Sequence, residues 1–131
     1  MKEIVNLIVG FIFFSVLLFP IQVEAQIVVN EFLASNTGST VDPDYKASAD
    51  WIELYNAGTT IANIGGYYLT DNFNDKIKWQ IPAGTSINAG GFLIIWADSH
   101  NTGLHTSFNI SASGEELAIY SNSGILIDSV S

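Results

Sequence analysis

Hydrophobic and polar residues alternate along much of the chain, most clearly from Asp50 to Asn56. In an extended chain Ile52 and Leu54 fall on one face, and the residues between and beside them fall on the other. This period of two is typical of a half-buried β-strand. Ala57-Gly58-Thr59-Thr60 follows with the small and polar residues of a turn, so the pattern predicts a core strand that ends near Asn56.

The chain after residue 25 repeats this arrangement of short extended runs separated by turns. It predicts about eight short strands, within residues 27–33, 50–56, 67–70, 76–81, 92–96, 104–110, 116–120 and 124–130, and a further short extended piece at residues 61–64. We interpret residues 83–91 as a loop. The run 92–96 is apolar on both faces, which predicts the most buried strand of the sheet. Together these elements predict an all-β fold, an antiparallel β-sandwich.

Residues 1–25 form a segment of another kind. Lys2 precedes a largely apolar run from Ile4 to Phe19, and Val23-Glu24-Ala25 places modest side chains where a signal peptidase cleaves. We expect residues 1–25 to be a cleavable signal peptide helix; the alternative is an uncleaved membrane anchor. The sequence therefore predicts a secreted or cell-surface protein that meets the membrane only through this segment.

Charge and cysteine content exclude several function classes. The chain has 4 Lys and Arg residues against 13 Asp and Glu residues, a formal net charge of -9. Such a surface repels phosphate backbones, so we expect no nucleic acid partner. There is no cysteine, which rules out thiol catalysis, disulfides and cysteine-ligated zinc. An exported domain without disulfides depends on its apolar core, and a bound cation would help it.

Carboxylates are the first set of candidate metal ligands. Glu31, Asp42, Asp50 and Glu53 lie on or between the first two predicted strands, which suggests a calcium site at one end of the sandwich. The alternative is that these acids accept hydrogen bonds from loop amides and stabilise turns. We expect no cofactor other than this calcium.

The two histidines give a second candidate set. Asp98, His100 and His105 offer the nitrogen and oxygen atoms that bind zinc, but their spacing matches no established zinc pattern. The sequence therefore favours their interpretation as ordinary surface residues.

Large aromatic side chains are the candidate binding residues. A sugar-binding sandwich uses one or two flat rings as a platform, and we select Trp79 and Tyr67 for that role. The alternative is that the rings pack in the core or at sheet edges, because strands favour aromatic residues.

A series of short motifs is similar to a known family. The motifs are Asn30-Glu31-Phe32, the strand 50–56, Gly66-Tyr67-Tyr68-Leu69-Thr70-Asp71, Lys78-Trp79, Ile81-Pro82-Ala83-Gly84 and Ile87-x-x-Gly90-Gly91-Phe92. In order and rough spacing they resemble the lamin-tail domain in its bacterial secreted form, and residues 104–108 and 127–130 extend the resemblance. It implies an immunoglobulin-like sandwich over residues 26–131, with the usual closing segment missing at the C-terminus.

The resemblance also implies a function without catalysis. We expect a non-catalytic binding or spacing module of a larger exported or cell-surface protein, and not an enzyme, because no stretch carries a complete catalytic set. One alternative is an accessory domain of a secreted enzyme, nuclease, phosphatase or spore-coat-kinase-like, whose catalytic part is not in this chain. Another is a carbohydrate-binding module. The sequence names neither the protein or glycan ligand nor the oligomeric state.

Overall fold

The computed structural model describes residues 26–114 and 116–131, so the predicted signal peptide at residues 1–25 lies outside the described residues. The described part of the chain contains nine β-strands. Their bounds are β1 Ile27–Leu33, β2 Trp51–Asn56, β3 Ala62–Asn63, β4 Tyr68–Thr70, β5 Trp79–Gln80, β6 Ser86–Ile87, β7 Phe92–Trp96, β8 Leu117–Tyr120 and β9 Leu126–Val130. Among these residues there is no helix with the length and apolar character needed to span a membrane.

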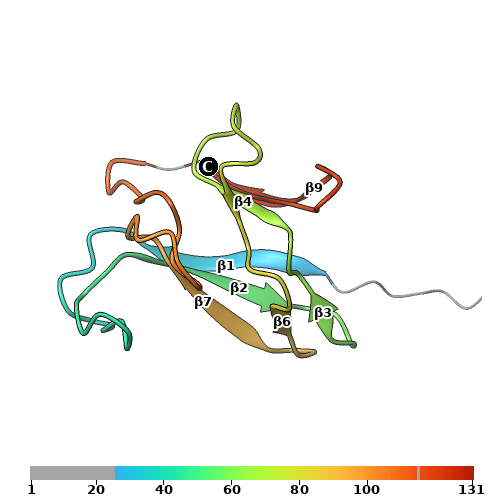
Figure 1. The fold of residues 1–131 in the computed structure, drawn as a ribbon, viewed down its shortest axis with the longest axis horizontal. Coiled ribbons are helices and arrows are strands. Elements are labelled where there is room, and N and C mark those ends of the chain that lie inside the picture. Colours follow the sequence, from blue (N-terminus) through green and yellow to red (C-terminus); the bar gives the residue numbers. More distant parts are fainter. Residues whose placement is uncertain (1–25, 115) are drawn as a thin grey trace, which may run out of the picture.

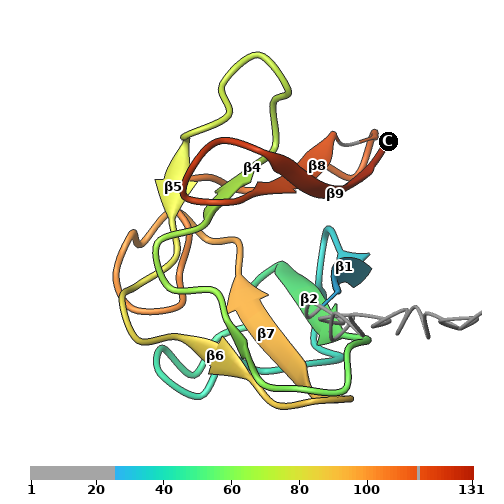
Figure 2. The same ribbon diagram turned by 90° about the vertical axis from the view of Figure 1, so that its right-hand side faces the viewer.

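The strands form two antiparallel sheets that face each other. One sheet has the order β1-β2-β7 and the other has the order β5-β4-β8-β9, while β3 and β6 form a separate two-stranded ribbon. Figure 2 shows the two sheets as separate layers, with β9 above β1 and with β6 beside β7. The predicted all-β, immunoglobulin-like antiparallel sandwich is confirmed.

The hydrophobic core lies between the two sheets. Ile52 and Leu54 of β2 are fully buried, as the alternating pattern predicts, and full burial stabilises the fold by about 1.5–3 kcal/mol for each such side chain. The other members with no more than 1% exposure come from both sheets and from their connections: Ile64, Leu69, Ile81, Ile95, Ala97, Leu117 and Ile119. The core therefore joins the two layers.

The most buried strand is β8 and not β7, so this prediction is wrong. All four residues of β8 are buried, because β8 lies between β4 and β9. In contrast, β7 is at the end of its sheet, and its first residue, Phe92, is 58% exposed. Phe92 stacks on Tyr55 with ring centroids 4.7 Å apart, so part of this apolar run covers the outer face of the sheet.

Three segments differ from the predicted secondary structure. Residues 104–110 form isolated bridges at His105 and Asn109 and no strand, because the hydroxyl of Thr106 bonds the backbone of Phe108 within the loop. The strand predicted for residues 76–81 is reduced to β5. The predicted loop 83–91 contains β6, a two-residue strand too short for a periodic signal, which pairs with β3.

The register of the first sheet brings two long loops to the same end of the sandwich. Leu33 pairs with Trp51, and Trp51 pairs with Trp96, so β1 ends, β2 begins and β7 ends at one level. The loop 34–50 joins β1 to β2, and the segment 97–114 follows β7; Figure 1 shows both on the same side. The amide of Ala97 donates to the carbonyl of Asp50 at 2.7 Å and fixes the two loops together.

Candidate functional site

The loop 34–50 is organised by the side chain of Asn36. Its amide nitrogen donates to the carbonyls of Thr40 and Ala49, and its side-chain oxygen accepts from the backbone amides of Gly38 and Ser39. The backbone amide of Asn36 donates to the carboxylate of Asp50 at 2.8 Å. One residue therefore closes the loop near both of its ends.

Inside this loop the chain turns around Asp42, which is fully buried. One carboxylate oxygen, Oδ1, accepts from the amide of Asp44 at 2.8 Å, and the backbone of Asp42 bonds both Lys46 and Ala47. The other oxygen, Oδ2, has no hydrogen-bond partner among the residues that the structure describes. It is 3.9 Å from Nδ1 of His105, which belongs to the other loop.

His105 is held by the backbone of the loop that follows β7. The amide of Trp96 donates to the carbonyl of Leu104, and the amide of Thr106 donates to the carbonyl of Trp96, both at 2.8 Å. These two bonds pair His105 with Trp96 in a single parallel β-bridge, on the side of β7 that faces away from β2. Between Asp98 and His105 the chain has positive φ at Ser99 (64°), Asn101 (54°) and Gly103 (54°), which lets it fold back.

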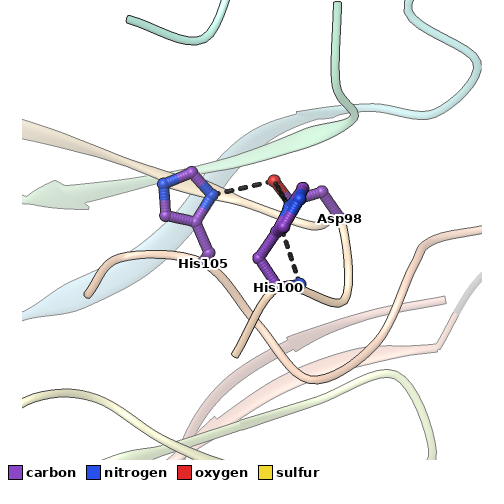
Figure 3. Close-up of side chains that lie close together, drawn as sticks. All are labelled: Asp98, His100 and His105. Carbon is purple, nitrogen blue, oxygen red and sulfur yellow. Dashed lines mark hydrogen bonds and ion pairs between the residues drawn. The ribbon is translucent and has the colours of Figure 1, made fainter. Parts of the chain in front are cut away.

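Both ring nitrogens of His105 face carboxylate oxygens. Nδ1 is 2.8 Å from Oδ2 of Asp98, as Figure 3 shows, and Nε2 is 3.2 Å from Oδ2 of Asp44. The imidazole is buried, with a residue exposure of 2%. A neutral imidazole has one N–H and one lone pair, so it donates to only one of these oxygens. A proton or a metal ion at the second nitrogen would satisfy the other.

His100 lies on the solvent side of the same carboxylate. Its Nδ1 is 2.7 Å from Oδ2 of Asp98, and its backbone amide donates to Oδ1 of Asp98 at 3.1 Å (Figure 3). The ring of Tyr45 stacks on the imidazole with centroids 3.8 Å apart and planes 11° from parallel. Two histidines of one loop therefore contact Asp98, and an aromatic ring of the other loop packs on both histidines.

The electrostatics of this group favour a charged pair. Burial by itself lowers the pKa of His105, but hydrogen bonds and charge from Asp98, Asp44 and Asp42 outweigh it, so the pKa is raised above 6.5. Burial by itself raises the pKa of Asp98, but the bonds from His105 and His100 outweigh it, so that pKa is lowered below 3.8.

Two sets of three ligand atoms in this group are each close enough together to hold a metal ion. Asp98, His100 and His105 form one set with ligand atoms within 4.8 Å of one another, and Asp42, Asp44 and His105 form another. A cleft of about 280 Å³ opens beside them, with Asp42, Tyr45, Asp50, Asp98 and His100 in its wall. We call these six side chains the loop cluster: Asp42, Asp44, Tyr45, Asp98, His100 and His105.

The structure does not bring the four predicted calcium ligands together. Asp42 and Asp50 line the same cleft, but Glu31 and Glu53 form a cross-strand pair on β1 and β2. Glu53 accepts from the side chain of Asn30 at 2.8 Å. Asp50 accepts from a loop amide, which is the alternative role that the sequence suggested.

His105 is not an ordinary surface residue, so that interpretation is wrong for it. The sequence signal was present, because Asp98, His100 and His105 lie within one loop. No sequence motif links Asp42 and Asp44 with His105, because His105 is 61 positions after Asp44. Only the register of the sheet places them beside it.

The aromatic residues selected for binding have different positions. Trp79 is 5% exposed and belongs to the core cluster, so the prediction of an exposed ring there is wrong. Its strand turns the ring toward the inside of the sandwich. Trp51 and Trp96 are buried too. Tyr67 is partly exposed and lines a second cleft of about 300 Å³, where sugar binding stays a prediction.

Comparison with known protein families gives a match that covers all the strands of the sandwich. The sequence matches the family model of the Lamin Tail Domain over residues 20–131. In the comparison with curated proteins, none matches this sequence. The lamin tail domain is an immunoglobulin-like fold without catalytic activity, and it serves as a protein-interaction module. Because the match covers most of the chain and the described strands form such a sandwich, this protein belongs to the lamin tail domain family.

Proposed function

We propose that this chain is a non-catalytic module that binds a partner polypeptide as part of a larger exported or cell-surface protein. The family supports an interaction role, and the apolar run and cleavage pattern in the sequence of residues 1–25 support export. The single observation that carries the proposal is the edge of the second sheet at β9, which has exposed apolar side chains and, among the described residues, pairs with a strand on one side alone.

β9 is an edge strand with exposed apolar side chains. Among the described residues it pairs only with β8, so one row of its backbone N–H and C=O groups is free of a neighbouring strand. Leu126 is 51% exposed, and Ile125 and Ile127 beside it are exposed too. Natural proteins usually protect such edges with charges, proline or a covering segment, because an open edge pairs with other chains.

An extended partner segment would add a strand to this edge. Main-chain hydrogen bonds to β9 would supply affinity, and apolar side chains at alternate positions would contact Leu126 and its neighbours. The net charge of -9 favours a neutral or basic segment over an acidic one, and it also steers basic partners toward the domain. No reacting group is needed for this role.

Site-specific photo-crosslinking in the source organism tests the proposal. A photoreactive amino acid is placed at Leu126, and in a matched control at Ile61, which is 54% exposed but lies outside the β9 edge. We expect a discrete protein adduct from position 126 and none from position 61. We also expect Leu126→Lys to abolish an adduct formed from Ser129 on the same strand, without a change in the unfolding midpoint.

Two results would overturn this proposal. One is the absence of an adduct from positions 126 and 129. The other is equal adducts from positions 126 and 61, which would show that contact follows exposure rather than the strand edge. If the domain binds a glycan instead, we expect the protein to be retained on polysaccharide and to give no adduct from positions 126 and 129.

A further inference from the structure

The strongest unexplained feature of the molecule is the Oδ2 oxygen of Asp42. It belongs to a fully buried residue, has no hydrogen-bond partner within residues 26–114 and 116–131, and lies 3.9 Å from Nδ1 of His105. Burial of an unpartnered carboxylate oxygen is costly, because the lost hydration is not replaced. Buried charges are normally paired or bound to a metal ion. The oxygen therefore faces the ring nitrogen of His105 that also contacts Asp98.

We propose that the loop cluster binds one divalent transition-metal ion, of which Zn²⁺ fits best. The ligands are Nδ1 of His105, Nδ1 of His100, Oδ2 of Asp98 and Oδ2 of Asp42. This site is independent of the β9 edge, because it lies in the two loops 34–50 and 97–114.

The spacing of the ligand atoms of Asp98, His100 and His105 suits tetrahedral zinc. Asp42 is grouped with Asp44 and His105 rather than with this set, so its side chain has to move toward the ion to become the fourth ligand. Zinc bonds to nitrogen and oxygen of about 2.0–2.2 Å place tetrahedral ligand atoms about 3.3 Å apart. The separations from Oδ2 of Asp98 to the two imidazole nitrogens are 2.7 and 2.8 Å, and the separation from Nδ1 of His105 to Asp42 is 3.9 Å. Shifts of about half an ångström would bring these three separations to the value for zinc.

The groups around the ligands hold the two imidazoles in the required orientation. A metal-bound histidine usually donates its other N–H to a carboxylate, which fixes the tautomer. Asp44 provides this acceptor, 3.2 Å from Nε2 of His105. For His100 the stacked ring of Tyr45 fixes the plane of the imidazole. The lone pairs on the two Nδ1 atoms can then face the ion.

The donor types select against calcium. Two imidazole nitrogens and two carboxylate oxygens suit zinc and its transition-metal neighbours, whereas Ca²⁺ takes six to eight oxygen ligands. Two carboxylates also balance the charge of one divalent ion. Since Asp42 comes from one loop and His100 and His105 come from the other, the ion would join two segments that are far apart in the sequence.

Metal titration of the purified protein, without a histidine tag and after treatment with chelator, tests the inference. We expect one equivalent of Zn²⁺ in calorimetry and the visible absorption of tetrahedral cobalt when Co²⁺ is used as a probe. We also expect Zn²⁺ to raise the unfolding midpoint, because the site is complete only in the folded protein. Ca²⁺ at the same concentration should leave the midpoint unchanged.

Substitutions separate this site from other acidic groups. His100→Ala is the main variant, because the side chain is 44% exposed and its removal spares the core. We expect it to weaken Zn²⁺ binding at least tenfold and to abolish the cobalt spectrum. Asp75→Asn, an exposed acid in the loop between β4 and β5, is the matched control and should bind as the native protein does.

Substitutions of Asp44 test whether this residue positions the imidazole of His105 for the metal ion. We expect Asp44→Ala to weaken zinc binding by about 10–100-fold, the usual effect of removing such a carboxylate. Asp44→Asn keeps an oxygen that accepts from Nε2, so it should retain most of the affinity. Two results would overturn the inference: the absence of stoichiometric Zn²⁺ binding, or binding that is equal in the native protein and in His100→Ala.

Discussion

The backbone amide of Val29 donates to the carboxylate of Asp128 at 2.8 Å, across 99 positions of sequence. Val29 lies in β1 and Asp128 lies in β9, so this bond joins an edge strand of one sheet to an edge strand of the other. At the next position, Asn30, β1 has an irregular register with β2. A side chain therefore supplies the acceptor for an amide that faces away from the partner strand.

Removal of this carboxylate should loosen the contact between the two edges. We expect Asp128→Ala to lower the free energy of unfolding by about 1 kcal/mol, because the amide of Val29 loses its acceptor. Asp128→Asn keeps an oxygen at this position and should lose less. Denaturant unfolding of both variants measures the difference, and equal losses would show that charge matters here rather than the hydrogen bond.

Asn56 at the end of β2 should be among the most sensitive polar residues. It is fully buried; its side-chain nitrogen donates to the carbonyls of Thr60 and Ile87, and its oxygen accepts from the amide of Gly58. We expect Asn56→Asp to lower the free energy of unfolding by about 2–4 kcal/mol, because a carboxylate cannot donate to these carbonyls. The exposed Asn63→Asp on β3 is the control, and a similar loss there would contradict this explanation.

Gly65 should not tolerate a side chain. A Cβ atom at this position would lie 2.7 Å from the backbone nitrogen of Gly84 and 3.0 Å from the carbonyl of Pro82. We expect Gly65→Ala to lower the free energy of unfolding by about 1–3 kcal/mol, because the backbone of the turn has to move.

Gly84 on the other side of this contact is the comparison for Gly65. It has a φ of 82° and open space around its Cβ direction, so Gly84→Ala has backbone strain alone. We expect a loss of about 1 kcal/mol there. Thermal and denaturant unfolding of the two variants would separate steric contact from strain, and a smaller loss in Gly65→Ala would contradict the predicted clash.

The stability of the metal-free protein should depend on pH through the loop cluster. The pKa of folded His105 is raised above 6.5, so its contribution to stability is complete below pH 6.5 and is lost as the pH rises through the folded value. The pKa of folded Asp98 is lowered below 3.8, so its contribution is complete above pH 3.8 and is lost as the pH falls through the folded value.

Stability should therefore decrease as the pH rises above 6.5 in the presence of chelator. Denaturant unfolding at a series of pH values measures this slope. We expect Asp98→Asn to flatten this slope. The substitution removes the charge of Asp98, which is one of the main causes of the raised pKa of His105. A slope that is identical in this variant would show that other groups produce the pH dependence.

Alternation in the sequence was enough to predict the strands that build the core. β1 has the predicted bounds, and the buried positions Ile52 and Leu54 are those that a period of two requires. The pattern could not predict which strand lies in the middle of a sheet, because sheet order depends on pairing between distant segments. For this reason β7 was predicted to be more buried than β8.

The candidate site was predictable only in part, for the same reason. Asp98, His100 and His105 belong to one loop and could be selected together from the sequence. Asp42 was selected too, but as a calcium ligand with Glu31, which lies on β1. The contact of Asp42 with His105 arises from the register that aligns Trp51 with Trp96, and no local pattern encodes that register.

The closure of loop 34–50 by Asn36 has a consequence for how this family can diverge. Because Asn36 bonds Thr40 and Ala49, the sandwich is connected to the loop mainly through one residue and its neighbours. The segment between them, which carries Asp42 and Asp44, can therefore be exchanged without a change to the core. Replacing this one segment would therefore gain or lose Asp42, Asp44 and Tyr45, the half of the loop cluster that it carries, while Asp98, His100 and His105 stay in the other loop.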